Sequence, residues 1–358
     1  MLSRKIKVLI IDDSAFMRKS LSLMLGSDPE IEVVGTARDG FEGIELTKRL
    51  CPDLITLDIE MPKMDGLTAL QKIMAENPTP VIMVSSITTD GADATIKALE
   101  LGAIDFIPKE TSFVSVNIVK IKEDLIQKVK LIVRQKEIKE RLMRLRGIKH
   151  KFTAETPKLF STTEKLPERN YKAIAIGVST GGPLSLQKII PKLSKHISCP
   201  VFIVQHMPPR FTKSLAERLD GMCSLEVKEA ENNEIVRNGV IYIAPGGFHM
   251  IIENGSVGII RTKISEEPVN TLHRPSVDVM LNSVVRIYGK NTLGIIMTGM
   301  GKDGFEAIKE LKNIGGVSLA QDEESCVVYG MPKAIIEGQL ADLIAPLEKI
   351  PELINMAF

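Results

Sequence analysis

The feature of this chain that most constrains its fold is an alternation of short apolar segments, rich in β-branched residues, with amphipathic helical patterns. In the first 109 residues, apolar runs such as Lys7–Ile11 and Leu54–Leu57 alternate with helical patterns such as Ala15–Leu25 and Leu67–Met74. Strands that alternate with helices indicate a parallel sheet with helices on both faces. The same alternation starts again at Tyr171, so the sequence predicts two α/β domains, each a doubly wound parallel sheet.

The segment between the two alternating regions has a different composition. A helical pattern covers about residues 116–146, and residues 120–151 carry twelve Lys or Arg against four Asp or Glu. A basic helix is compatible with attachment to nucleic acid or to a membrane. The interspersed acids and the lack of aromatic residues favour a solvated face instead, with a stripe packed on the sheet: Ile121, Leu125, Val129 and Ile132. Residues 147–170 resemble a linker in composition. We therefore expect a first domain over 1–125, a helical extension and linker over 126–170, and a second domain over 171–358.

Charge and apolar content argue against several classes of protein. The formal net charge is +1, so no global field calls for nucleic acid or a membrane surface as partner. No apolar run approaches the roughly 20 residues that a membrane-spanning helix needs. The N-terminal apolar stretch ends in acids rather than in the small residues of a signal cleavage site. The four cysteines lack C-x-x-C spacing, which argues against zinc and disulfides. We expect a cytoplasmic protein that is not inserted in a membrane, and a monomer.

Acidic and polar side chains gather where the strands of the first domain should end. Asp12 and Asp13 follow the first strand, Asp58 ends the third, Ser85 the fourth and Lys109 the fifth. Functional groups of a doubly wound sheet gather at the carboxyl ends of its strands. Three carboxylates there would repel one another unless a hard cation such as Mg²⁺ joined them. Plain helix capping is an alternative interpretation of acids at strand ends.

The pieces VLIIDDS, LDIEMPKMDG, VIMVSS and LGAIDFIPK resemble response-regulator receiver domains over about residues 5–125. The resemblance implies a flavodoxin-like fold, Mg²⁺ as cofactor and a histidine kinase as the partner that phosphorylates Asp58. It also implies a set of roles for matching residues: Mg²⁺ ligands at Asp12, Asp13, Asp58 and the Glu60 carbonyl, a switching hydroxyl at Ser85, an aromatic switch at Phe106 and a phosphoryl-pairing ammonium at Lys109. Receivers usually have Pro after this lysine, whereas this chain has Glu110, which leaves the loop geometry there open.

Three strand ends in the second domain carry residues suited to acyl transfer. Ser179 lies in IAIGVSTGGP, which fits G-x-S-x-G at a strand-to-helix turn whose N–H groups can stabilise an oxyanion. A nucleotide phosphate loop is less compatible, because G-x-G-x-x-G and G-K-[ST] are both missing. His206 ends the strand of VFIVQHMPP, and Asp303 lies in the turn of LGIIMTGMGKDG. Each has an alternative interpretation without a catalytic role: His206 as a structural histidine and Asp303 as a helix cap. Together they can supply a nucleophile, a base and an orienting carboxylate.

Two other arrangements compete with this set. The order Ser–His–Asp differs from the Ser–Asp–His order of α/β hydrolases, which argues against that fold. A second Ser–His–Asp set lies within TLHRPSVDV, at His273, Ser276 and Asp278. These residues enter a predicted helix, so Ser276 and Asp278 are more simply interpreted as first-turn residues.

The segments IAIGVSTGGP, VQHMPP, YIAPGGFHM, HRPSVDVM, IIMTGMGKDG and ESCVVYGMPKAI resemble the catalytic domain of the chemotaxis protein-glutamate methylesterase family. That family also has an N-terminal receiver and a linker, so the resemblance covers nearly the whole chain. It implies a Rossmann-like hydrolase domain, with Ser179 as nucleophile, His206 as general base and acid, and Asp303 as its orienter. Oxyanion and substrate-associated positions fall at Thr180, Gly181, Gly182 and Met300. A β-hairpin insertion is indicated separately, by Asn254-Gly255 between two apolar runs.

The expected function is removal of methyl esters from glutamate side chains of chemoreceptors, and deamidation of particular glutamines, under control of phosphorylation. No cofactor is expected for the ester chemistry. Three alternatives remain at this point: a DNA-binding response regulator, an α/β hydrolase of small esters, and an interaction module with a decayed site. The strand–helix alternation after residue 171 disfavours the first of these, because no compact helix-turn-helix pattern is evident there.

Overall fold

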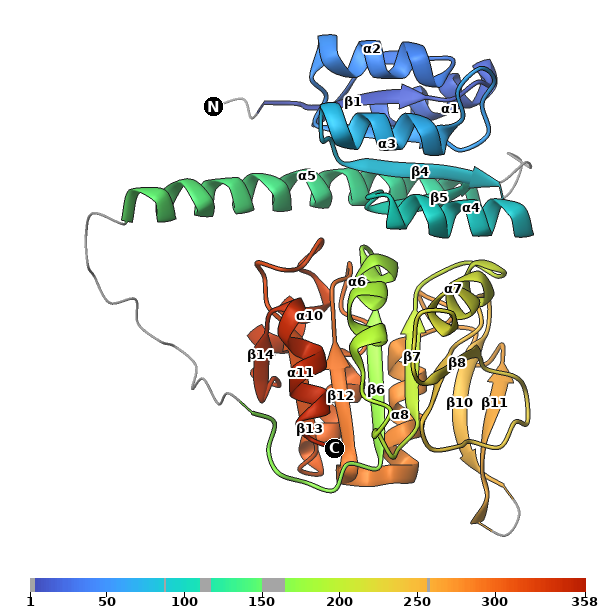
Figure 1. The fold of residues 1–358 in the computed structure, drawn as a ribbon, viewed down its shortest axis with the longest axis vertical. Coiled ribbons are helices and arrows are strands. Elements are labelled where there is room, and N and C mark those ends of the chain that lie inside the picture. Colours follow the sequence, from blue (N-terminus) through green and yellow to red (C-terminus); the bar gives the residue numbers. More distant parts are fainter. Residues whose placement is uncertain (1–3, 87, 110–116, 150–164, 256–257) are drawn as a thin grey trace. The chain divides into compact units, whose positions relative to one another are not determined.

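The computed structural model describes residues 4–86, 88–109, 117–149, 165–255 and 258–358. The chain divides into two compact units, residues 1–141 and 142–358 (Figure 1). Each unit contains its own parallel sheet and its own buried core. The predicted fold class, two doubly wound parallel-sheet domains, is confirmed.

The first unit is a five-stranded parallel sheet in the order β2-β1-β3-β4-β5. Its strands and helices alternate along the chain: β1 (Ile6–Ile11), α1 (Ala15–Gly26), β2 (Ile31–Ala37), α2 (Gly40–Leu50), β3 (Leu54–Asp58), α3 (Gly66–Glu76), β4 (Val81–Ser86), α4 (Thr89–Glu100), β5 (Asp105–Lys109) and α5 (Asn117–Lys149). The chain starts in β1 near the middle and builds outward on both sides, which places the end of β1 beside the end of β3.

Polar side chains set the starts of the first four helices. Ser14, Asp39, Asp65 and Thr88 each accept a hydrogen bond from a backbone N–H of the first turn. Such a cap satisfies one of the N–H groups that a helix start leaves without a partner. Several acids near the strand ends are therefore caps, whereas Asp12, Asp13 and Asp58 are not the cap of any of these helices.

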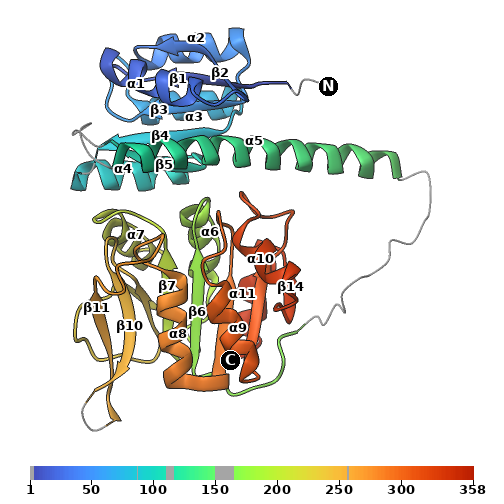
Figure 2. The same cartoon turned by 180° about the vertical axis from the view of Figure 1, so that it is seen from behind.

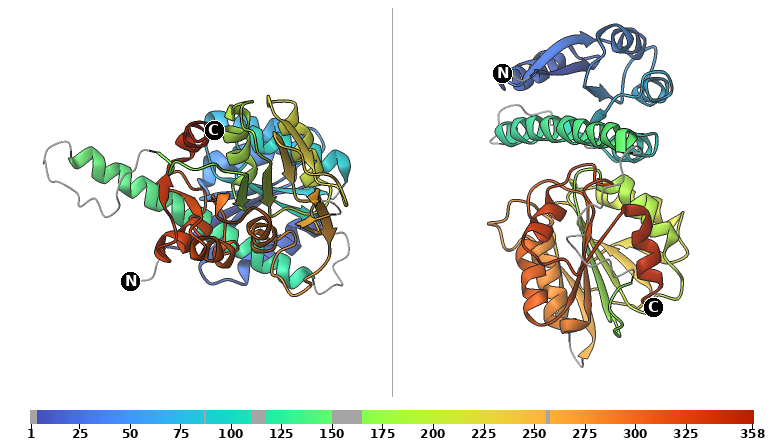
Figure 3. Two further views of the ribbon diagram at one scale, coloured as in Figure 1. Left: turned by 90° about the horizontal axis from the view of Figure 1, so that it is seen from below. Right: turned by 90° about the vertical axis from the view of Figure 1, so that its left-hand side faces the viewer.

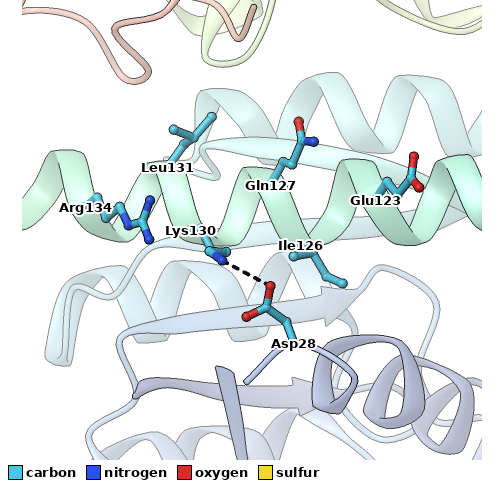
Figure 4. A pocket seen from close by; sticks show the side chains of 7 residues that line it. All are labelled: Asp28, Glu123, Ile126, Gln127, Lys130, Leu131 and Arg134. Atoms are coloured by element: carbon cyan, nitrogen blue, oxygen red, sulfur yellow. Dashed lines mark hydrogen bonds and ion pairs between the residues drawn. The ribbon is translucent and has the colours of Figure 1, made fainter. Parts of the chain in front are cut away.

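Helix α5 runs 33 residues without a break and crosses residue 125, where we expect the first domain to end. Three residues of its predicted apolar stripe, Leu125, Val129 and Ile132, are buried, whereas the fourth, Ile121, is half-buried. An open pocket of about 420 Å³ lies along the same helix, where Lys130 contacts Asp28 at 3.1 Å (Figure 4).

The second unit has a seven-stranded parallel sheet in the order β14-β13-β12-β6-β7-β9-β8. Its elements are β6 (Ala173–Val178), α6 (Gly182–Ile189), β7 (Val201–Gln205), α7 (Phe211–Asp220), β8 (Glu226–Glu229), β9 (Val240–Ile243), β10 (His249–Asn254), β11 (Ile260–Ser265), α8 (Val277–Tyr288), β12 (Thr292–Ile296), α9 (Phe305–Asn313), β13 (Val317–Gln321), α10 (Met331–Glu337), β14 (Leu343–Ala345) and α11 (Ile350–Asn355), with short 3₁₀ turns at Ile190–Lys192, Gly289–Asn291 and Leu347–Lys349.

Helices cover both faces of this second sheet, α8 and α9 on one side and α6 and α11 on the other (Figures 2 and 3). The central strand β6 lies between β12 and β7, so the direction of winding reverses there. In an open parallel sheet, a crevice forms outside the carboxyl ends of the strands at such a reversal. The sheet order therefore brings the residues after β6, β7 and β12 to one edge.

The hairpin insertion exists, but its predicted turn is wrong. Strands β10 and β11 pair antiparallel with Asn254 opposite Ile260, so Asn254 belongs to the strand and the connection is longer than two residues. The pairing register buries Met250, Ile252 and Thr262 on one face. A two-residue turn at Asn254-Gly255 would give a different register, and burial of one face specifies the register strongly.

Candidate active site and candidate phosphoryl-acceptor site

Three carboxylates gather at the carboxyl edge of the first sheet. Asp12 and Asp58 are buried and Asp13 is exposed, and one oxygen of each lies within 4.8 Å of the others. The Lys109 ammonium, at the end of β5, lies 2.6 Å from Asp58 Oδ2 and 3.1 Å from Asp12 Oδ2. The structure therefore brings these four residues together.

The electrostatics of this pocket favour a bound cation. Burial raises the pKa of Asp58 to about 6, and the Asp12 carboxylate adds to the shift while Lys109 opposes it. Burial likewise raises the pKa of Asp12. Removing an ionised carboxylate from water is unfavourable, and a second carboxylate nearby adds repulsion. Three hard oxygen donors this close together match the ligand preference of Mg²⁺, so the residues fit that ion.

The remaining receiver positions lie on β4, on β5 and in the turn after β3. Ser85 is buried, and its hydroxyl donates to the Gly91 carbonyl in α4 at 3.1 Å. The backbone N–H of Glu60 donates to Asp58 Oδ1 at 3.3 Å, which places this residue next to the acceptor carboxylate. Phe106 is buried in β5. Glu110 lies outside the described residues, so the loop that it opens stays a matter of prediction.

Ser179 lies in a tight turn between β6 and α6. Its backbone N–H donates to the Thr298 carbonyl at 3.0 Å, and its carbonyl accepts the N–H of Gly182 at 2.8 Å. Gly181 has φ +74°, and a Cβ there would lie 2.5 Å from the Val327 side chain. A Cβ on Gly182 would overlap the Gln205 side-chain oxygen. Both glycines are therefore required by space, and the first also by its left-handed backbone.

His206 and Asp303 form a hydrogen-bonded pair beside this turn. The distance from His206 Nε2 to Asp303 Oδ2 is 2.8 Å. The backbone N–H of His206 donates to the Val178 carbonyl at 3.2 Å, so Ser179 and His206 directly follow neighbouring paired strands. The other ring nitrogen of His206, Nδ1, is buried and has no hydrogen-bond partner. It is thus free to accept a proton from a nearby hydroxyl.

Asp303 is held ionised and in one orientation. Oδ1 accepts the Ser276 hydroxyl at 2.9 Å and the Asp278 N–H at 3.0 Å, and Oδ2 accepts the Val277 N–H at 2.7 Å. Burial alone would raise the pKa of Asp303, but the contact with His206 and the backbone donors outweigh burial and hold that pKa below its ordinary value. A carboxylate that accepts several hydrogen bonds in this way stays charged, because those hydrogen bonds favour the ionised form.

The residues of the competing set, His273, Ser276 and Asp278, lie around the His206–Asp303 pair and contact it. Ser276 is the N-cap of α8, one position before the first turn in which the sequence analysis placed it, and also donates to Asp303. Asp278 accepts the Ala307 N–H at 2.8 Å, and burial raises its pKa to about 6. The His273 ring stacks on His206 with centroids 4.1 Å apart and planes 17° from parallel. These contacts were missed because nothing local in TLHRPSVDV indicates that it meets the Asp303 turn.

Three of the four positions expected around the oxyanion follow Ser179 in its turn, and Met300 follows Gly299, where a Cβ would lie 2.8 Å from the Ser179 Cβ. The four differ in whether their backbone N–H is free to bind an oxyanion. Thr180, Gly181 and Gly182 are buried, and Met300 is half-buried. The Gly182 N–H is already committed to the Ser179 carbonyl, which argues against it as an oxyanion donor. The N–H groups of Thr180, Gly181 and Met300 remain as candidates.

Comparison with known proteins decides the family. Residues 174–354 match the family model "CheB methylesterase", and residues 8–117 match "Response regulator receiver domain". The chain belongs to the CheB methylesterase family. It is an enzyme of the methylesterase class whose catalytic domain follows a receiver domain. The match to a catalytic domain argues against the DNA-binding alternative.

Relatives in the same family are similar to this chain over nearly its whole length, and a solved structure is similar over the catalytic domain. A protein of Pyrococcus horikoshii named protein-glutamate methylesterase/protein-glutamine glutaminase is 46% identical, over 100% of this chain and 95% of that protein. One from Oleidesulfovibrio alaskensis, with the same name and the number 1, is 48% identical over 98% and 99% of the two chains. The crystal structure of the Thermotoga maritima CheB methylesterase catalytic domain is 45% identical, with a TM-score of 0.51, and covers 53% of this chain and all of that one.

Among the described residues, no helix is both long and apolar enough to cross a membrane. The long helix α5 carries charged residues, mostly lysine and arginine, along most of its length.

Proposed function

We propose that this enzyme hydrolyses glutamate methyl esters on bacterial chemoreceptors and deamidates particular glutamines of the same receptors, with Ser179 as nucleophile. The observation that carries the proposal is the 2.8 Å contact of His206 Nε2 with Asp303, which leaves a buried, unpartnered Nδ1 at the strand end beside Ser179. The names of the relatives supply the substrate class.

The reaction follows from the roles that these groups can take. Ser179 Oγ attacks the ester carbonyl carbon while His206 Nδ1 takes its proton, and Asp303 stabilises the imidazolium through Nε2. Backbone N–H groups of the turn hold the negative charge that develops on the carbonyl oxygen. The C–O bond then breaks, and methanol leaves with the proton from His206. Water, activated by His206, attacks the acyl-enzyme and releases the glutamate carboxylate and Ser179.

Deamidation uses the same steps with ammonia as leaving group. The amide C–N bond breaks instead of the ester C–O bond, and His206 protonates the nitrogen. A single site therefore accounts for both activities in the names of the relatives. The ester chemistry as written uses only groups of this chain.

The receiver supplies the control. Asp58 accepts a phosphoryl group from a histidine-kinase partner, with Asp12, Asp13 and the Glu60 carbonyl as Mg²⁺ ligands and Lys109 paired with the phosphoryl oxygens. Bound Mg²⁺ neutralises charge on the phosphoryl group. Two observations support this assignment: burial raises the pKa of Asp58, and the Lys109 ammonium lies beside its carboxylate. A pocket in which one buried carboxylate is already unfavourable accommodates the further negative charge of a phosphoryl group only with cations present. Phosphorylation changes the population of chains whose catalytic site is open to receptors.

The test is methanol release from methylated receptor membranes, with and without a phosphodonor. The Ser179→Ala variant should lose methanol release by at least about 10⁴-fold, because no other group takes the acyl intermediate. Its fold should be unchanged, since the turn is held by backbone hydrogen bonds that the substitution leaves in place.

A serine outside the site provides the matched control. The Ser224 hydroxyl donates to the Leu193 carbonyl, on a different loop, so Ser224→Ala should release methanol at the wild-type rate. Methanol release at the wild-type rate from Ser179→Ala would show that the nucleophile assignment is wrong. A wild-type chain that releases methanol from generic esters but not from receptors would overturn the substrate.

A further inference from the structure

One buried hydroxyl joins three segments of the catalytic unit. Thr298 follows β12, and its side chain is fully buried. Its Oγ1 lies 2.9 Å from the Thr180 carbonyl oxygen, in the Ser179 turn, and accepts the N–H groups of Val327 and Val328 at 3.1 and 3.0 Å. Its backbone carbonyl accepts the N–H of Ser179 at 3.0 Å. Thr298 therefore contacts the nucleophile turn through both its side chain and its main chain.

The hydrogen-bonding capacity of this hydroxyl is used up. A threonine hydroxyl donates one hydrogen bond and accepts two. Here it accepts two backbone N–H groups, and its proton is shared between the Thr180 carbonyl at 2.9 Å and the Val328 carbonyl at 3.3 Å. The shorter distance favours Thr180. A saturated, fully buried hydroxyl does not reach substrate, so any effect of Thr298 on the reaction must act through the groups it holds.

The direction of the Thr180 carbonyl determines the direction of the Gly181 N–H. Within a planar trans peptide unit, the C=O of one residue and the N–H of the next point in opposite directions. Thr298 holds the Thr180 carbonyl toward the buried side of the turn, so the Gly181 N–H points the other way.

The preceding peptide unit is held in the same way by a different residue. The Ser179 carbonyl accepts the Gln205 Nε2 at 3.0 Å and the Gly182 N–H at 2.8 Å. The Thr180 N–H therefore also points away from the groups that hold the turn. Two successive N–H groups that emerge side by side form a concavity that binds anions.

We infer that Thr298 is a positioning residue of the esterase site: its hydroxyl holds the Thr180 carbonyl and thereby aims the Gly181 N–H at the oxygen that becomes negative during acyl transfer. The inference rests on the proposed function, because it requires Ser179 to be the nucleophile. It adds a residue that neither contacts substrate nor belongs to the Ser179–His206–Asp303 set.

The experiment compares Thr298→Val with Thr298→Ser in the full chain, with saturating phosphodonor and methylated receptor membranes. Valine has nearly the shape of threonine but no hydroxyl, so the Thr180 peptide unit loses its anchor. We expect kcat to fall by about 10- to 100-fold, less than the 10²- to 10³-fold typical of deleting an oxyanion donor, because the N–H is misaligned rather than removed. KM should change by less than about 3-fold. Thr298→Ser keeps the hydroxyl and should retain kcat within about 3-fold.

The pH profile separates this role from a general structural one. The His206–Asp303 pair is untouched by the change, so the shape of the kcat–pH profile should match the wild type. Thr292→Val is the matched control, because Thr292 is equally buried in β12 and its hydroxyl has no hydrogen-bond partner. Its kcat should stay at the wild-type value.

Each outcome decides the inference. A folded Thr298→Val variant whose kcat falls by less than 10-fold, whose loss lies in KM, or whose pH profile shifts would overturn it, and so would a Thr298→Ser variant as impaired as the valine variant. If Thr298→Val does not fold, Thr298→Cys replaces the hydroxyl with a weaker donor at the same position, and wild-type kcat in that variant overturns the inference. Failure of the proposed function is distinguishable, because it appears as activity in Ser179→Ala whatever Thr298 does.

Discussion

At the scale of single residues, Asp303 has the most demanding position in the catalytic unit. Both of its oxygens accept a backbone N–H, and each also has a side-chain partner, Ser276 or His206. An asparagine in this place has only one acceptor oxygen. Whichever way its amide is turned, its NH₂ group faces a backbone N–H, and two donors cannot satisfy each other.

We therefore expect Asp303→Asn to lose both activity and stability. The kcat for methanol release should fall by about 10²- to 10⁴-fold, because the imidazolium of His206 loses its counter-charge. The free energy of unfolding of the catalytic unit should fall by about 1–3 kcal/mol, because a buried donor is left unsatisfied. Denaturant unfolding and methanol release measure the two effects.

The stability effect should depend on pH in one direction. The folded-state pKa of Asp303 lies below its ordinary value of 3.8, so its ionised form stabilises the fold above about pH 4. That contribution is lost as the pH falls below about 4 toward the folded-state pKa. The difference in the free energy of unfolding between wild type and Asp303→Asn should therefore become smaller below about pH 4. Asp220→Asn is the control, because the Asp220 carboxylate accepts a single N–H, from Val227, which an asparagine oxygen can also accept. If the difference in unfolding free energy between wild type and Asp303→Asn became larger on acidification, the assignment of Asp303 as an ionised, stabilising carboxylate would be contradicted.

At the scale of secondary-structure elements, one buried ion pair fastens α5 to β5. Lys128 Nζ lies 3.1 Å from Asp105 Oδ2 and 3.2 Å from Asp124 Oδ2, and donates to the Phe106 carbonyl at 3.2 Å. Burial would lower the pKa of Lys128, but the two carboxylates outweigh it and raise that pKa, so the ammonium stays charged. The contact joins the helix to the strand that carries Phe106.

Lys128→Met should destabilise the first unit by about 3–5 kcal/mol, because the buried Asp105 carboxylate loses its counter-charge. The measurement is the denaturant dependence of amide exchange in β1 and β3 peptides of the full chain. Lys130→Met is the control on the same helix. Lys130 contacts Asp28 (Figure 4) and also Glu30, whose side chain is 39% exposed, so the loss of these contacts should matter much less. If Lys128→Met and Lys130→Met lost equal amounts of stability, the buried ion pair of Lys128 would not contribute more than an ion pair near solvent, and the prediction would be wrong.

At the scale of the whole molecule, two compact units with separate cores should be able to fold separately. The catalytic unit has a fully parallel seven-stranded sheet of its own, and a relative's catalytic domain has been crystallised alone. If the unphosphorylated receiver keeps the catalytic site closed in most chains, removing the receiver should release activity without a phosphodonor.

A fragment of residues 165–358 should therefore release methanol at least about 10-fold faster than the unphosphorylated full chain, which corresponds to a closed population of about 90%. Full-length Asp58→Asn should have the basal rate of the unphosphorylated chain and should not respond to a phosphodonor. A fragment no faster than the unphosphorylated full chain would contradict inhibition by the receiver. An Asp58→Asn chain that still responds would place the phosphoryl acceptor elsewhere.

Much of the fold and the membership of the candidate sites could be predicted from the sequence. The strand and helix patterns rest on short-range periodicity, and the buried runs of β1, β3, β6 and β7 are strong enough to be recognised without a partner. The two edge strands of the catalytic sheet were not predicted. β8 is four residues with three charges, and β14 is three residues long, so neither has a pattern that differs from a loop.

The sequence by itself determined two alternating α/β regions, the strand ends that carry Asp58 and Ser179, and the two glycines of the nucleophile turn, because each depends on neighbours within a few residues. Only the tertiary structure decided what these groups meet. Asp303 is held by Ser276, 27 residues away, and the Thr180 carbonyl by Thr298, 118 residues away. Such pairings follow from strand order and register, which bring distant segments to one sheet edge, and no local pattern of residues encodes them.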